Sequence, residues 1–131
     1  MSRAEEALGS AWEQREGPGV LATVDAEGRP NAVYVLCVDL LAGARIAVMD
    51  NYFSKTRENI LANPRAVVQV VDPDTAAHYR LTLHYLRTET AGALFEHMKA
   101  KLAGIASHTG MGKVFRLLGA DIYRVESIES V

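Results

Sequence analysis

Short runs of apolar and β-branched residues, separated by turn-forming residues, extend over most of the chain. The runs cover residues 20–24, 31–38, 46–50, 66–71, 78–88 and 120–125. Gly28, Gly43 and the Asp-Pro-Asp sequence at 72–74 are expected in turns between them, the turn through Gly43 running from residue 40 to residue 45, because these residue types favour tight reversals. Six short strands with tight turns predict a mainly β protein that forms a small antiparallel barrel, since closure removes exposed sheet edges.

Apolar residues recur with helical spacing in two further segments. Residues 2–15 predict an amphipathic helix that ends at the Gly-Pro-Gly sequence of residues 17–19, which cannot continue it. Residues 91–103 predict another helix, whose apolar stripe consists of Leu94, Phe95, Met98 and Leu102. Both helices are expected to lie at the periphery of the barrel.

The bulk composition restricts the class of protein. The chain has 131 residues, which suits one domain spanning 1–131. Its net charge is 14 − 16 = −2, so no general attraction to nucleic acid or to an anionic membrane is expected. The single cysteine, Cys37, lies in an apolar run, and no stretch reaches the ~20 apolar residues of a membrane span. A cytoplasmic location is expected because the N-terminus also lacks a signal peptide pattern.

The segment NYFSKTRENILANPR, residues 51–65, has the strongest chemical signal in the chain. A short helix is expected to begin after Ser54 and to end at Asn63 and Pro64, because proline cannot continue a helix. Its first turn then carries Lys55 and Arg57, and cations are unfavourable at the positive end of a helix dipole. A bound phosphate would compensate, with help from the hydroxyls of Ser54 and Thr56. The alternative is an ordinary solvated helix start.

Other candidate groups give weaker signals. The four histidines, His78, His84, His97 and His108, lack metal-ligand spacing, so no metal site is expected. Residues 108–113, HTGMGK, lack the full phosphate-loop pattern and receive no assigned element. No Ser/His/Asp arrangement or carboxylate pair stands out, and the catalytic residues are unknown at this level.

Three segments in order, GVLATVDAEGRPNAVYV, IAVMDNYFSKTRENILANPRAVVQVVD and YRLTLHYLRTE, resemble the FMN-binding split-barrel family. That family includes the pyridoxamine 5′-phosphate oxidases and small flavin-binding proteins. The resemblance runs from about residue 19 to 88, with 120–125 as the closing strand. It implies a six-stranded antiparallel split β-barrel of Greek-key type with peripheral α-helices. It also implies a homodimer with FMN in a groove between the subunits.

The resemblance assigns a role to particular positions. It implies that the FMN phosphate lies on Ser54, Lys55 and Thr56, with Asn59 one helical turn further on. It places the isoalloxazine ring along one strand and at the end of another, at Val33, Tyr34, Val35, Met49 and Asp50. Strand N–H and C=O groups beside aliphatic side chains suit a flat apolar ring with polar edges.

Departures from the family pattern narrow the expected activity. The oxidases carry a second-strand arginine that reaches the phosphate, but residues 32–36 contain none. Their C-terminal R-L-H element is also missing, and Leu83 stands where many members have glycine. We therefore expect an FMN-dependent oxidoreductase acting on a small molecule, and not a true pyridoxamine phosphate oxidase. The alternatives are a non-catalytic flavin carrier or electron-transfer protein, and a fold relative that binds haem or a deazaflavin.

Overall fold

The fold is described by a computed structural model for residues 19–35, 38–50, 55–71, 76–109 and 117–130. The predicted helix at 2–15, Cys37, Ser54 and the turn at 72–74 lie outside these residues. In chain order the described elements are β1 (Gly19–Val24), β2 (Pro30–Val35), β3 (Val38–Leu41), β4 (Arg45–Asp50), α2 (Lys55–Ala62), β5 (Arg65–Val71), β6 (His78–Glu89), α3 (Ala93–Thr109) and β7 (Gly119–Ser130).

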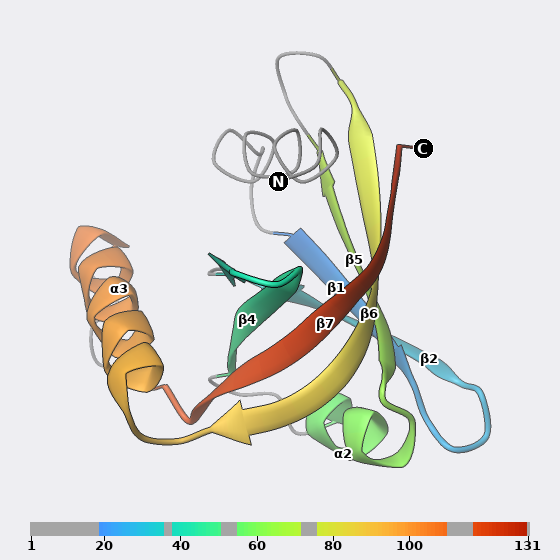
Figure 1. Cartoon of the computed structure of the whole chain (residues 1–131), viewed down its shortest axis with the longest axis horizontal. Helices are drawn as coiled ribbons and strands as arrows, with labels where there is room; N and C mark the ends of the chain where they lie inside the picture. Colours follow the sequence, from blue (N-terminus) through green and yellow to red (C-terminus); the bar gives the residue numbers. More distant parts are fainter. Residues whose placement is uncertain (1–18, 36–37, 51–54, 72–75, 110–116, 131) are drawn as a thin grey trace.

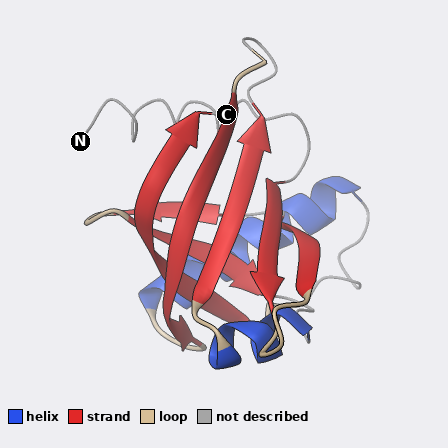
Figure 2. Cartoon of the chain, turned by 90° about the vertical axis from the view of Figure 1, so that its right-hand side faces the viewer, coloured by secondary structure: helices blue, strands red, loops and turns tan. Residues whose placement is uncertain are grey.

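All the described strands belong to one antiparallel sheet, in the order β2-β1-β5-β6-β7-β4-β3. The sheet curls into a half-barrel, with the long strands β6 and β7 running together through its middle (Figure 1). β5 returns beside β1 and β7 returns beside β4, so neighbours in the sheet are not always neighbours in sequence. This arrangement confirms the predicted mainly β, split-barrel fold with peripheral helices (Figure 2).

The sheet has seven strands in the described part of the chain, one more than the sequence predicted. Residues 38–41 form β3, which pairs with β4 from Val38 opposite Val48 to Leu41 opposite Arg45. The prediction of a turn beginning at residue 40 was therefore wrong. The reversal is confined to residues 42–44, where Gly43 and Ala44 both have positive φ. Such a tight turn leaves more residues for pairing.

Two elements are longer than their apolar patterns indicated. β7 continues to Ser130 because it pairs with β6 along its length, including polar positions that carry no apolar signal. Helix α3 continues to Thr109, so His108 belongs to a helix and not to a glycine-rich loop. In both cases pairing or helical continuation extends past the last residue that hydrophobicity marks.

Successive residues of β4 serve two different cores, because side chains alternate between the faces of a strand. Val48 packs inside the curl in a cluster with Leu21, Val35, Ile60, Leu81, Leu83 and Tyr123. Met49 points the other way and packs against α3, in a cluster with Met98, Leu102 and Ile122. The predicted apolar stripe of α3 is confirmed, since Leu94 and Phe95 pack against this second cluster.

Candidate functional site

Helix α2 connects strands from the two ends of the sheet. Asn59 Nδ2 donates to Thr23 Oγ1 on β1 at 3.0 Å. On the neighbouring strand β2, Asn31 Nδ2 donates to Thr56 Oγ1 at 3.4 Å. At the other end, Arg57 Nη2 donates to Asp50 Oδ2 on β4 at 2.7 Å. The helix therefore holds the split barrel closed at this point, with the predicted anion-binding turn as its first turn.

The predicted limits of this short helix are confirmed from Lys55 onward. It ends at Ala62, the Asn63 N–H donates to the Asn59 carbonyl at 2.7 Å, and Pro64 prevents further helical bonding. Asn63 Oδ1 then accepts from the Arg65 N–H at 3.2 Å. The asparagine side chain thus caps the break and directs the chain into β5.

The predicted phosphate residues lie in different environments. Lys55 is exposed, and its Nζ is 3.7 Å from Oε2 of Glu58, which is a weak surface ion pair. Thr56 and Asn59 are each 1% exposed and use their side chains to attach α2 to the sheet. Lys55 is therefore accessible to a ligand, whereas Thr56 and Asn59 have structural roles in the folded chain.

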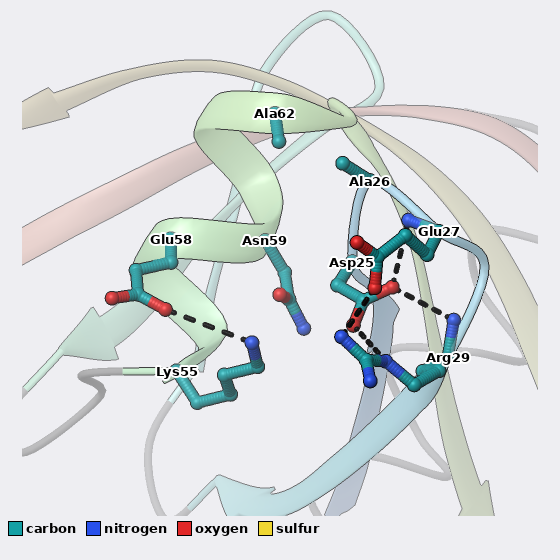
Figure 3. A pocket seen from close by; sticks show the side chains of 8 residues that line it. All are labelled: Asp25, Ala26, Glu27, Arg29, Lys55, Glu58, Asn59 and Ala62. Carbon is teal, nitrogen blue, oxygen red and sulfur yellow. Dashed lines mark hydrogen bonds and ion pairs between the residues drawn. The ribbon is translucent and has the colours of Figure 1, made fainter.

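A cavity of about 250 Å³ lies between α2 and the turn that joins β1 to β2. It is lined by Lys55, Glu58, Asn59 and Ala62 from the helix and by Asp25, Ala26, Glu27 and Arg29 from the turn (Figure 3). Arg29 is already neutralised, because its Nε contacts Asp25 Oδ2 at 2.8 Å and its guanidinium also pairs with Glu27. The other cation of the cavity, Lys55, has only the longer contact of 3.7 Å with the exposed Glu58 carboxylate.

The Asp25 carboxylate organises the turn on the far side of the cavity. Oδ1 accepts from the backbone N–H groups of Glu27 and Arg29, both at 2.9 Å. The hydrogen bond from the Arg29 side chain, followed by those from the backbone, lowers the pKa of Asp25 to about 2. The Asp25 carboxylate is therefore ionised at neutral pH, and Asp25, Glu27 and Arg29 together give this wall of the cavity a net charge of −1 − 1 + 1 = −1.

The predicted ring-binding residues on β2 lie at an edge of the sheet. β2 pairs only with β1 in the described sheet, so one side of its backbone offers N–H and C=O groups that no strand uses. Val35 is buried in the inner core, Val33 packs against that core, and Tyr34 is 72% exposed on the opposite face. The free backbone edge and the exposed aromatic ring make β2 a suitable surface for a flat ligand.

The structure does not bring the two predicted β4 residues to a common surface. Met49 is buried under α3, and Asp50 points to the inner face. Asp50 is fully buried with its carboxylate bonded to Arg57. Its principal contact is thus an internal ion pair at the start of α2.

Sequence reasoning missed a buried polar chain next to this ion pair. Thr88 on β6 faces Asp121 on β7 directly, and its Oγ1 donates to Asp121 Oδ1 at 2.6 Å. The Tyr85 hydroxyl lies 2.6 Å from the same Oγ1. Burial above all, and then the Asp50 carboxylate, raise the pKa of Asp121 to about 7, although the Thr88 bond opposes the shift. Asp50 in turn raises the pKa of Arg57 through their hydrogen bond.

The buried chain has unsatisfied polar atoms. Oδ2 of Asp121 and the hydroxyl of Tyr123 have no hydrogen-bond partner within the described part of the molecule, and both residues are at most 1% exposed. Desolvation is the main reason why the pKa of the Tyr123 phenol is raised. An isolated aspartate in an apolar strand was the only sequence signal for this region.

No group of three or more His, Cys, Asp or Glu side chains in the described residues is placed to hold a metal ion. Among the helices described, none is both long and apolar enough to cross a membrane.

The fold and the site together define a split-barrel protein with an accessible cation at the start of a barrel-closing helix. The sequence profile of a family described as Pyridoxamine 5′-phosphate oxidase matches residues 6–119. The chain therefore belongs to that family. None of the curated proteins matches the sequence significantly.

Solved structures with the same fold include proteins of different description. An FMN-binding protein from Syntrophomonas wolfei is 19% identical, with a TM-score of 0.80, 98% of this chain covered and 88% of the other. HupZ from Group A Streptococcus is 26% identical, with a TM-score of 0.72 and coverage of 97% and 92%. HutZ, described as a haem storage protein from Vibrio cholerae, is 18% identical, with a TM-score of 0.64 and coverage of 99% and 95%.

Proposed function

We propose that the protein binds FMN and acts as an oxidoreductase that passes electrons or hydride between a small molecule and the flavin. The phosphate is assigned to the first turn of α2, with Lys55 as its principal cation, and the ring to the free edge of β2. The observation that carries this proposal is the hydrogen bond between Asn31 on β2 and Thr56 on α2, which holds the two half-sites side by side.

The spacing along β2 supports this assignment. Val33 and Val35 lie two and four residues beyond Asn31, which corresponds to about 7–13 Å at ~3.3 Å per residue. The ribityl chain of FMN is long enough to join a phosphate near Thr56 to a ring at these positions. The backbone groups of an edge strand suit the polar rim of the ring, and the aliphatic side chains suit its faces.

The charges at the start of α2 also support a phosphate ligand. Lys55 and the free N–H groups of the first helical turn are donors for an anion. Arg57 uses one N–H on Asp50 and retains other donors, and its side chain is 45% exposed. With no arginine at residues 32–36, the family's second-strand contact is absent. The phosphate is therefore assigned to α2 itself, assisted by a partner subunit.

The flavin, when bound, would supply the redox chemistry, and the chain would bind it and orient it. A steady-state assay with NAD(P)H and an electron acceptor distinguishes an oxidoreductase from a carrier. Turnover supports the enzyme, and tight FMN binding without turnover supports the carrier.

The binding proposal is tested with purified protein and two ligands that differ only in the phosphate. We expect FMN to bind with quenching of its fluorescence and Lys55→Ala to weaken FMN by about tenfold or more, since a charge-assisted hydrogen bond is lost. Riboflavin affinity should change little. Equal losses of affinity for both ligands would place the phosphate elsewhere. The charge-matched control is Arg65→Ala, which removes an exposed cation at the start of β5.

A haem-binding function is the second candidate, because the fold is shared with HutZ. The same titration with haemin in place of FMN distinguishes the two. A strong Soret band with no flavin quenching would favour haem over FMN.

A further inference from the structure

We infer that Asp50 and Asp121 share a single proton, and that this proton couples anion binding at the start of α2 to pH. Arg57 is the positioning residue that transmits the coupling, because it lies on the same helical turn as Lys55. The inference rests on the proposed function for its ligand, but the shared proton itself does not.

Strand register places the two carboxyl groups on one face. Asp121 is opposite Val48 in the β4–β7 pair, and Asp50 is two residues further along β4. Residues two apart on a strand point to the same side, so Asp50 and Asp121 are diagonal neighbours within the barrel. Both side chains are at most 1% exposed.

A bulge in β6 brings the remaining members of the cluster to this face. The register of β6 against β7 shifts between Tyr85 and Arg87. Residues three apart on a regular strand point to opposite faces, but the extra residue lets Tyr85 and Thr88 both point inward. The Tyr85 hydroxyl then reaches Thr88 Oγ1, which donates to Asp121.

The charged and titratable groups around the proton come from four elements. Asp50 is on β4, Arg57 on α2, Tyr85 on β6, and Asp121 and Tyr123 on β7. When both carboxyls are ionised, Asp121 Oδ2 has no donor within the described residues. A proton on either carboxyl converts their contact into a hydrogen bond and leaves one negative charge opposite Arg57.

The loss of this proton changes the electrostatics of the anion site. With the proton present, the pair carries one negative charge and Arg57 neutralises it. Without the proton, a second buried negative charge lies behind the first turn of α2 and opposes any anion there. Anion binding and proton binding therefore favour each other, as thermodynamic linkage requires.

The test compares FMN with riboflavin in wild-type protein and in Asp121→Asn, which resembles the protonated acid at every pH. At about pH 8.5 the ratio of FMN to riboflavin affinity should be about three- to tenfold higher in Asp121→Asn, and at about pH 5.5 the two proteins should agree. The phosphate of free FMN titrates in the same way in the experiments on both proteins, so its titration cancels when the wild type and Asp121→Asn are compared at one pH. Glu129→Gln, an exposed charge removal on β7, should follow the wild type at both pH values.

A second measurement serves if Asp121→Asn fails to fold. Calorimetry of FMN binding to the wild type near pH 7, in buffers with different ionisation enthalpies, should show that a fraction of one proton is taken up. In Thr88→Val the pH range of this uptake should move upward, because the Thr88 hydrogen bond that lowers the pKa of Asp121 is lost. The ¹³C side-chain signal of Asp121 should titrate near neutral pH without ligand. FMN binding with no proton uptake would overturn the coupling. Titration of Asp121 at the ordinary pH of an aspartate would overturn the shared proton. If Asp121 titrates near neutral pH but FMN does not bind, both the anion coupling and the proposed function are overturned, and the shared proton stands.

Discussion

At the scale of single residues, Asp121 shows how burial sets the protonation of a carboxyl group. The pKa of this group rises from 3.8 to about 7 in the folded chain, mainly through desolvation. The folded state therefore binds more protons than the unfolded state between these two values. Since stability falls with pH wherever the native state binds the extra proton, the contribution of Asp121 becomes increasingly unfavourable from about pH 4 to about pH 7.

Asp121→Asn should remove this pH dependence. We expect the free energy of unfolding of the wild type to decline by about 2 kcal/mol between pH 5 and pH 8, and that of Asp121→Asn to decline less. At low pH the Asp121 acid is already neutral, so the wild type no longer has the stability loss that its ionisation causes at higher pH. Urea denaturation at several pH values measures both proteins, and parallel profiles would contradict the assignment.

The buried Tyr123 and the partly buried Tyr85 give a matched pair of substitutions. Their rings lie in an edge-to-face contact with centroids 5.7 Å apart, but only the Tyr85 hydroxyl has a partner within the described residues. Tyr85→Phe should therefore destabilise the protein by about 1 kcal/mol, whereas Tyr123→Phe should be neutral or stabilising. Chemical denaturation at constant pH tests the contrast. A larger loss of stability in Tyr123→Phe than in Tyr85→Phe would contradict the assignment of the hydrogen bond to Tyr85.

At the scale of elements, helix α2 depends on tertiary contacts for its existence. Eight residues are too few for a stable isolated helix, and its first turn carries two cations. Its attachment comes from the burial of Ile60, the Asn59 bond to Thr23, and the ion pair of Arg57 with Asp50. The first turn of α2, where the anion site is proposed, therefore takes its position only when both ends of the sheet are in place.

Asn59→Ala should show that this residue anchors the helix. It leaves the buried Thr23 hydroxyl without its partner, so we expect a loss of about 2 kcal/mol in the free energy of unfolding. Glu58→Ala, at the exposed neighbouring position, should change it by less than about 0.5 kcal/mol. A double-mutant cycle with Thr23→Val measures the coupling directly, and additive effects would mean that the two side chains do not interact.

Gly119, the first residue of β7, lies very close to the Thr88 side chain of the buried polar chain. A Cβ atom at this position would lie 2.6 Å from Thr88 Cγ2, whose hydroxyl is already held by Asp121. Gly119→Ala should therefore destabilise the protein by about 1–3 kcal/mol. Thr88→Ser keeps the hydroxyl and removes the methyl group, so the double variant should recover much of the loss in a thermal melt. If the double variant is no more stable than Gly119→Ala alone, the added Cβ atom clashes with a group other than the Thr88 methyl.

At the scale of the whole molecule, the outer face of β1 and β2 is the proposed dimer surface. Tyr34 and Val20 are cross-strand neighbours there, with exposures of 72% and 38%. Adjacent exposed apolar side chains on an edge strand suit a symmetric partner. We propose that a second copy of the chain covers this face and completes the FMN site.

Tyr34→Glu should weaken that dimer, because it places a charge in an apolar interface. Light scattering coupled to size-exclusion chromatography should show a shift toward monomer at micromolar concentration. Leu61→Glu, at a residue on α2 that is 70% exposed, is the control and should leave the mass unchanged. A monomeric wild type would contradict the dimer, and a dimeric Tyr34→Glu would place it on another face.

The parts of the fold that follow from local periodicity were predictable. The alternating pattern located the strands, Asn63 and Pro64 located the end of α2, and the apolar stripe located α3. β3 was missed because residues 38–41 are too short and too near a turn for a clear signal, and they become a strand only by pairing with β4. Of the candidate site, the ligand roles of Lys55, Thr56 and Asn59 stay predictions. Sequence could not show that Lys55 is exposed while Thr56 and Asn59 are buried, because burial depends on how α2 packs on the sheet.

The sequence by itself determined the class of fold and the family, because both depend on the order of strands and on a short motif that local residues carry. Tertiary structure alone decided which side chains meet. The diagonal contact of Asp50 and Asp121 joins residues far apart in sequence. The bulge that turns Tyr85 and Thr88 to one face, and the ion pair of Arg57 with Asp50, join closer residues but depend on how β6 pairs with β7 and how α2 packs on the sheet. Burial and proximity set the charge of such groups, and neither quantity exists until the chain has folded.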